Sequence, residues 1–105
     1  MKPTFVYITC KNQEEARKIG RAVVEDQLAA CANIIPQMVS IYKWEGKMQE
    51  DSETVLILKS HMALNEDLVA RVQELHSYEV PAILTLPIVG GSEAYVEWMA
   101  GEMRV

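Results

Sequence analysis

The chain has 105 residues, of which 50% are apolar, and a net charge of −5. This length fits a single domain, 1–105, with enough apolar side chains for a core that needs no disulfide or structural metal. No Lys/Arg cluster indicates a nucleic-acid partner, and no apolar run is long enough to indicate a membrane span. Two cysteines are too few for a disulfide framework, and no signal-peptide pattern precedes residue 3, so we expect a cytoplasmic protein.

The N-terminal residues predict a strand followed by a helix. Residues 3–10 (PTFVYITC) are rich in β-branched and aromatic side chains, as strands are. Asn12 and, three residues later, Glu15 form the sequence pair of a helix N-cap and capping box. Apolar residues then recur at helical spacing, so the helix is expected to end near residue 28 or 29.

The next segment predicts a β-hairpin. Residues 33–44 form a strand pattern that Pro36 interrupts, and proline is tolerated in a strand only at a sheet edge or a bulge. Residues 53–60 form the following strand. The turn between the two strands is expected at Gly46 or at Asp51–Ser52, and we favour Asp51–Ser52 with a long, bent strand.

The second half of the chain predicts a helix, a strand and a short helix. One helix face is marked by Leu64, Leu68, Val72 and Leu75. Asn65 or Ser60 is the expected cap of this helix. Residues 80–88 form the fourth strand, and Ser92 is expected to cap the last helix.

The order βαββαβ plus a short C-terminal helix is that of an α+β, ferredoxin-like fold with an antiparallel sheet. Within this sheet we expect the first and third strands to lie side by side and parallel at the centre. Cys10, which ends the first strand, would then share one rim of the sheet with residues that precede the fourth strand and with residues that end the third. These residues are His76, Tyr78 and Glu79, and Lys59, Ser60 and His61.

The predicted strands are apolar on both faces. In the first strand, Phe5 and Tyr7 lie on one face, while Val6 and Ile8 lie on the other. Two helices cover only one face of such a sheet, and monomers rarely expose a large contiguous apolar surface. The second face therefore predicts self-association.

Five segments, LAACANIIP, SIYKWEGK, VLILKS, LHSYEVPAILTLPI and YVEWM, occur in order over nearly the whole chain. Together they resemble the CutA divalent-cation tolerance family. The resemblance implies a ferredoxin-like homotrimer that is linked to tolerance of divalent metals, copper especially, and that has no enzymatic activity. Two positions depart from the family pattern. Ser77 stands where proline is common, and Leu75 stands where some members carry a second histidine.

Cys10 and His76 are the candidate metal ligands. The resemblance links both positions to copper, and a thiolate with an imidazole suits copper(I). Glu79 and His61 are candidate additional ligands. A structural role competes with ligation at both main positions, because a buried cysteine fits a strand end and a histidine suits the C-terminus of a helix.

The resemblance also suggests which residues contact a second subunit. Trp44 is expected to pack between chains, with Tyr42, Glu45 and Tyr78 as further interface residues. Cys31, among small apolar residues, is expected in the core.

The leading hypothesis is therefore a homotrimeric metal-tolerance protein that binds copper and uses no organic cofactor. The alternative is a trimeric signalling or scaffold module that binds a small molecule or a protein partner in clefts between subunits. No catalytic motif is present, and only Cys10 with His76 pairs a nucleophile with a base, so we do not expect an enzyme.

Overall fold

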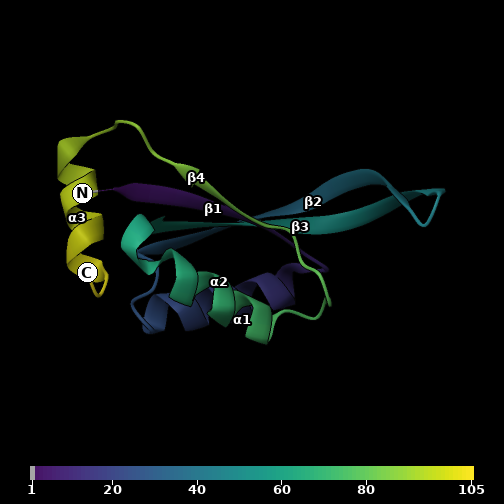
Figure 1. Ribbon diagram of the computed structural model, residues 1–105, viewed down its shortest axis with the longest axis horizontal. Coiled ribbons are helices and arrows are strands. Elements are labelled where there is room, and N and C mark those ends of the chain that lie inside the picture. The colour runs from purple at the N-terminus through teal and green to yellow at the C-terminus, as the bar shows by residue number, and fades with distance from the viewer. Residues whose placement is uncertain (1) are drawn as a thin grey trace.

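The computed structural model describes residues 2–105, which form a ferredoxin-like α+β fold (Figure 1). Its elements are β1 (Pro3–Cys10), α1 (Gln13–Glu25), β2 (Cys31–Trp44), β3 (Lys47–His61), a 3-10 turn η1 (Met62–Leu64), α2 (Asn65–Leu75), β4 (Ile83–Pro87) and α3 (Glu93–Glu102). Helices α1 and α2 cover one face of the sheet, α3 lies at one end, and the far ends of β2 and β3 project as an arm. The predicted fold class and element order are confirmed, although β4 is shorter than the predicted strand.

The sheet is antiparallel throughout, with the strand order β2-β3-β1-β4. The predicted parallel pairing of the first and third strands is wrong. The crossover through α1 leaves β2 parallel to β1, but the hairpin reverses the chain, so β3 runs opposite to both. Cys10 of β1 therefore lies opposite Thr54, while Pro3 lies opposite His61. Cys10 and His61 are consequently at opposite ends of the sheet.

The hairpin turns at Glu45–Gly46, and the favoured position at Asp51–Ser52 is wrong. Glu45 has φ 51° and Gly46 has φ 79°, as the two central residues of a type I′ turn require. Asp51 and Ser52 lie inside β3 and pair with β2. Pro36 lies where a bulge interrupts the β2–β3 register, and β2 is an edge strand, as the proline predicts.

Two of the three predicted helix caps are confirmed. The Asn12 Oδ1 atom accepts the N–H of Glu15 at 2.9 Å at the start of α1, and Ser92 caps α3. Helix α2 has no side-chain cap, because Asn65 lies inside its first turn and Ser60 donates to a carbonyl oxygen elsewhere. Within residues 2–105, none of the helices combines the length and the apolar composition that crossing a membrane requires.

The core lies between the helices and the face of the sheet that they cover. Val6 and Ile8 of β1 are fully buried there, beside Leu56 and Leu58 of β3. Helix α1 contributes the apolar stripe that its sequence predicts, with Ile19 fully buried. The predicted division of the β1 side chains between two faces, with Val6 and Ile8 on one and Phe5 and Tyr7 on the other, is therefore confirmed.

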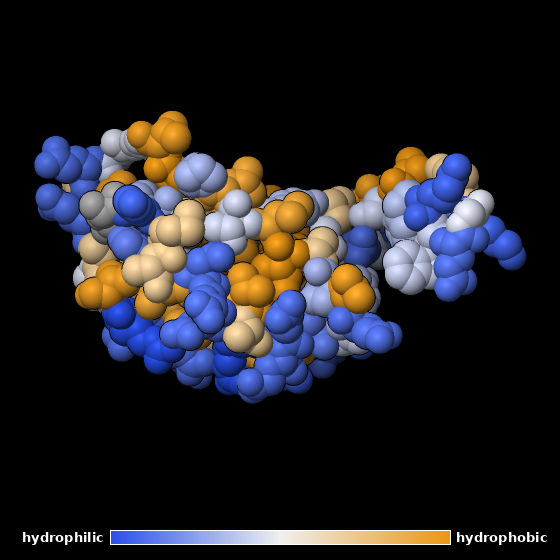
Figure 2. Space-filling view, viewed as in Figure 1, coloured by the Kyte–Doolittle hydropathy of each residue, from blue (hydrophilic) through white to orange (hydrophobic). Residues whose placement is uncertain are grey.

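The opposite face of the sheet is apolar and uncovered. Phe5, Leu84 and Leu86 lie side by side on it and are all exposed. The arm also exposes large hydrophobic side chains, namely Val39, Ile41, Tyr42, Trp44 and Met48. Figure 2 shows hydrophobic side chains along the side away from α1 and α2 and on the projecting arm, whereas the side formed by the two helices is mostly hydrophilic.

Candidate functional site

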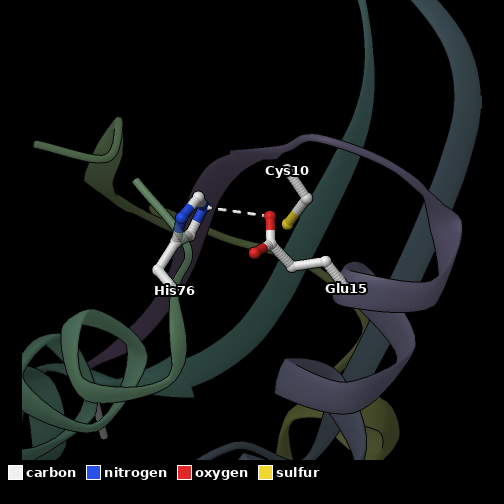
Figure 3. A group of neighbouring side chains, drawn as sticks. All are labelled: Cys10, Glu15 and His76. Carbon is white, nitrogen blue, oxygen red and sulfur yellow. Dashed lines mark ion pairs between the residues drawn. The ribbon is translucent and has the colours of Figure 1, made fainter. Parts of the chain in front are cut away.

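Three side chains from separate parts of the chain meet where β1 ends (Figure 3). Cys10 is the last residue of β1, Glu15 lies in the first turn of α1, and His76 follows α2. All three are buried, and their potential ligand atoms lie within 4.8 Å of one another. The structure thus brings together the two predicted metal ligands and adds a third group.

The sequence predicts only a capping role for Glu15. Its position could have indicated more, because a helix that begins directly after a strand places its first turn beside the strand end. The Oε1 atom of Glu15 accepts the N–H of Lys11 at 3.0 Å, and the Oε2 atom accepts the N–H of Ser77 at 2.9 Å. Glu15 therefore connects the start of α1 to the segment that follows α2.

The Glu15 carboxylate is held in its charged form. Burial raises the pKa of Glu15, but hydrogen bonds from Ser77 and Lys11 outweigh the burial and hold the pKa below its ordinary value. The Nε2 atom of His76 lies 3.9 Å from Oε1 of Glu15, too far for a direct hydrogen bond. Glu15 therefore makes its hydrogen bonds to backbone N–H groups, and its interaction with His76 is a longer electrostatic contact.

Both ring nitrogens of His76 have hydrogen-bond partners. The Nδ1 atom accepts the N–H of Tyr78 at 3.0 Å, and Nε2 lies 2.8 Å from the carbonyl oxygen of Thr9. Since the first partner is a donor and the second an acceptor, a neutral imidazole with its proton on Nε2 satisfies both. His76 also occupies the C-cap position of α2, where its backbone N–H donates to the carbonyl oxygen of Val72 at 2.9 Å.

The thiol of Cys10 is protonated at neutral pH. Its side chain is fully buried, and burial, together with the negative charges of Glu15 and Glu53, raises the pKa of Cys10 to about 12. The thiolate is the form that binds metals and attacks electrophiles. The cluster at rest is therefore a thiol, a carboxylate and a neutral imidazole.

The two additional ligands that the sequence predicts do not join this cluster. His61 lies at the other end of β1, where its Nδ1 atom accepts the N–H of Ala63 at 2.9 Å and caps η1. The error follows from the wrong strand direction. Glu79 is exposed and lines a neighbouring cleft instead. Cys31, expected in the core, is only partly buried and lies on the edge strand β2.

The neighbouring cleft has a volume of about 510 Å³. It is lined by Thr9, Tyr42, Trp44, Glu53, Tyr78, Glu79, Val80 and Ala82. Tyr78 donates its hydroxyl to Oε2 of Glu53 at 2.8 Å, and Tyr42 donates to Asp51. Three of the four predicted interface residues therefore line this cleft, while the fourth, Glu45, forms the hairpin turn.

The tyrosine hydroxyls of the cleft remain protonated. Burial and the hydrogen bond to Glu53 raise the pKa of Tyr78, and the hydrogen bond to Asp51 raises the pKa of Tyr42. Each hydroxyl is thus a donor to a carboxylate. The negative charge at the cleft resides on the carboxylates.

The sheet order, the uncovered apolar face, the projecting hairpin arm and the buried group of metal-binding residue types define a class of small ferredoxin-like α+β proteins. Comparison with known families identifies one family for this chain. The family model described as CutA1 divalent ion tolerance protein matches residues 4–102, and the chain belongs to this family. The resemblance carried by the sequence segments is confirmed, and the family description names no reaction.

Relatives from plants and bacteria match most of the chain. A chloroplastic CutA protein of Arabidopsis thaliana is 46% identical over 99 residues, which cover 94% of this chain and 54% of that protein. A divalent-cation tolerance protein CutA of Thermus thermophilus is 45% identical over 94 residues, which cover 90% and 91% of the two chains. The chain spans about half the length of the Arabidopsis, mouse and human relatives that it matches.

Solved structures of the family have the same fold. The divalent cation tolerance protein of Thermus thermophilus superposes with a TM-score of 0.93 at 42% identity and covers 96% of this chain and 98% of that one. CutA1 of Oryza sativa superposes with a TM-score of 0.96 at 38% identity and covers 99% and 95%. The fold of this chain is therefore the fold of these CutA structures.

Proposed function

We propose that the chain acts in divalent-cation tolerance as a homotrimer that binds copper weakly, as copper(I), at Cys10 and His76. The observation that carries the proposal is the buried group formed by Cys10, Glu15 and His76, in a chain of the CutA1 divalent ion tolerance family. A soft thiolate and an imidazole form a suitable ligand pair for copper(I). The cytoplasmic location predicted from the sequence remains part of this proposal.

The donor set fits copper(I), but the resting hydrogen bonds oppose its entry. The Cys10 thiol must lose its proton, and a metal at Nε2 of His76 must replace the proton that bonds to Thr9. Metal binding that releases protons strengthens as the pH rises. Glu15 would supply a nearby negative charge, while its bonds to Lys11 and Ser77 keep it in place. Copper affinity is therefore expected to be modest and to increase with pH.

Copper(I) titration of matched cysteine variants tests this proposal. Cys10→Ala should bind one copper ion fewer per chain than the parent. Cys31→Ala is the control, because Cys31 lies outside the cluster, and this variant should bind copper as the parent does. Circular dichroism and light scattering establish that both variants fold and assemble. Equal affinity and stoichiometry in the parent and in Cys10→Ala would show that the cluster is structural.

The bare face and the arm support the homotrimer. Phe5, Leu84 and Leu86 are exposed side by side on the sheet, and Val39 and Trp44 are 60% exposed on the arm. Both outer strands, β2 and β4, also present edges with unpaired backbone groups. A repeated head-to-tail contact between such surfaces closes into a ring when the rotation between subunits allows it. We propose that the arm of each subunit packs against its neighbour.

Light scattering at micromolar concentration tests the assembly. We expect three times the monomer mass of 11.9 kDa for the parent. If Trp44 becomes buried between subunits, Trp44→Ala should destabilise the assembly by about 3–5 kcal/mol. Trp98→Ala provides a matched control on α3. A parent that remains a monomer contradicts the proposal, and an unaffected Trp44→Ala variant places Trp44 outside the interface.

The cleft favours a second candidate function. A trimeric signalling or scaffold module would bind a small molecule or a partner at such a cleft, which has a volume of about 510 Å³. A protein sample stripped of metal that still binds a ligand at this cleft would favour this alternative.

A further inference from the structure

Residues 76–81, which we name the gate segment, connect the buried cluster to the residues that we place in the subunit interface. The gate segment leads from α2 towards β4 and contains both His76 and Tyr78. We propose that it is the gate of the Cys10 cluster, that Tyr78 is its latch, and that contact between subunits keeps it closed. The inference rests on the proposed function. Its test measures the reactivity of a thiol without copper, so its failure is distinguishable from a failure of copper binding.

The cluster is closed to solvent, so a metal ion or a reagent reaches it only when a covering segment moves. Cys10 is fully buried, and the side chains of His76 and Glu15 are 0% and 6% exposed. Cys10 ends a strand and Glu15 begins a helix. In the described part of the chain, residues 77–81 belong to no helix or strand and make no hydrogen bond between backbone groups. Since segments with few such bonds open at a lower free energy than the whole fold, the gate segment is the cover expected to open first.

Side-chain hydrogen bonds hold the gate segment in place. The N–H of Ser77 donates to Oε2 of Glu15 at 2.9 Å, and the hydroxyl of Tyr78 donates to Oε2 of Glu53 at 2.8 Å. The N–H of Tyr78 also donates to Nδ1 of His76 at 3.0 Å, and the centroids of these two rings lie 4.8 Å apart. A movement of Tyr78 therefore acts directly on a wall of the cluster.

The gate segment passes the edge of β1 and reaches both faces of the sheet. Strand β4 pairs with β1 from Thr4 to Ile8, and beyond this pairing the carbonyl oxygen of Thr9 meets Nε2 of His76 at 2.8 Å. Cys10 belongs to the core under the helices, so the side chain of Thr9 lies on the opposite face. Tyr78 lines the cleft that Thr9 also lines. One short segment thus contacts the cluster on one face and the proposed interface on the other.

A second copy of the chain is the occupant expected against Tyr78. Tyr42 and Trp44 of the arm line the same cleft and belong to the proposed interface, so their exposure in a single chain describes a surface that a neighbour covers. Val80 of the gate segment is 81% exposed and lines this cleft as well. Contacts of a neighbour with Tyr78 and Val80 would have to break before the gate opens. Assembly should therefore slow the opening.

Alkylation of Cys10 by iodoacetamide at pH 8 measures how often the gate opens, because a buried thiol does not react. All samples carry Cys31→Ala, which leaves Cys10 as the only thiol. Tyr78→Phe keeps the ring and removes the hydroxyl bond to Glu53, so we expect about tenfold faster labelling. Tyr95→Phe is the matched control, because it removes a tyrosine hydroxyl bond on α3, and it should label as the parent does. Equal rates for Tyr78→Phe and the parent would overturn the latch.

A destabilised variant distinguishes gate opening from unfolding of the whole chain. Gly20→Ala places a Cβ 3.0 Å from the Cβ of Ala32, in the core and away from the gate segment. Urea unfolding gives the stability of this variant and of Tyr78→Phe. For an equal loss of stability, Tyr78→Phe should speed up the labelling of Cys10 more than Gly20→Ala does. Labelling rates that follow stability alone in both variants would assign Tyr78 a purely structural role and overturn the gate.

A loosened assembly tests the contribution of the neighbour. Trp44→Ala leaves the bond between Tyr78 and Glu53 in place but removes a proposed interface residue. We expect labelling of Cys10 at least about threefold faster than in the parent, and a rate that rises as the protein is diluted. Trp98→Ala, on α3, should keep the rate of the parent. Light scattering of the same samples reports the assembly separately. A loosened assembly that labels at the rate of the parent, or a parent that is already a monomer, would overturn the role of the neighbour.

Discussion

Replacing Glu15 by alanine should destabilise the fold strongly, although Glu15 occupies only the first turn of a helix. The substitution removes the acceptor for the N–H groups of Lys11 and Ser77, at 3.0 and 2.9 Å. A hydrogen bond to a charged group contributes about 1.5–3 kcal/mol, and a buried N–H that loses its acceptor costs about 1–3 kcal/mol. Because both bonds are only partly buried, we expect a combined loss of about 2–4 kcal/mol, or about 10–20 °C in melting temperature.

Glu14→Ala is the matched control for this prediction. Glu14 is exposed in the same turn, so its loss should cost only the helix-dipole contribution of about 0.3–1 kcal/mol. Urea unfolding of both variants should be compared at one protein concentration, because the proposed association would contribute to stability. If Glu15→Ala and Glu14→Ala lose equal stability, the carboxylate of Glu15 does not anchor the segment after α2.

The same anchor predicts a pH dependence. The folded-state pKa of Glu15 is lowered, so its contribution to stability is fully present above the unfolded value near 4.5. The contribution is lost as the pH falls through the lower folded-state value. The free-energy difference between the parent and Glu15→Gln should therefore be constant near neutral pH and should shrink below about pH 4.5. A difference that grows on acidification would contradict this assignment.

The remaining predictions concern two glycines and the two cysteines. Gly20→Ala should destabilise the protein by about 1–3 kcal/mol, because the new Cβ would lie 3.0 Å from the Cβ of Ala32. Gly101→Ala places its Cβ where no atom lies within 4 Å, so this change should stabilise α3 by up to about 1 kcal/mol. Thermal melts of both variants check this, and equal effects would contradict it. Iodoacetamide at pH 8 should modify the partly exposed Cys31 much faster than the buried Cys10, whose pKa is raised to about 12. Mass spectrometry gives the order, and faster labelling of Cys10 would mean that the cluster is open to solvent.

Local sequence determines most of the helices and strands and which face of the sheet stays uncovered. The pairing of Asn12 with Glu15 predicts the start of α1, and Pro36 predicts the bulge of an edge strand. Both signals work because they depend on backbone groups within a few residues. The two-faced pattern of β1 likewise predicts the bare side of the sheet, since alternation fixes which side chains share a face.

Only the tertiary structure decided the composition of the site. The position of the hairpin turn was open, because Asp51–Ser52 was as compatible with local composition as Gly46. The direction of β3 does not depend on that position, since any hairpin after β2 runs β3 antiparallel to β2 and therefore antiparallel to β1, which sends His61 to the far end of β1. Glu15 lies near Cys10 because α1 begins directly after β1, but His76 joins them only because the end of α2 packs beside the end of β1, a contact between segments distant in sequence. The strongly raised pKa of Cys10 has the same origin, since burial and neighbouring charge are set by segments distant in sequence.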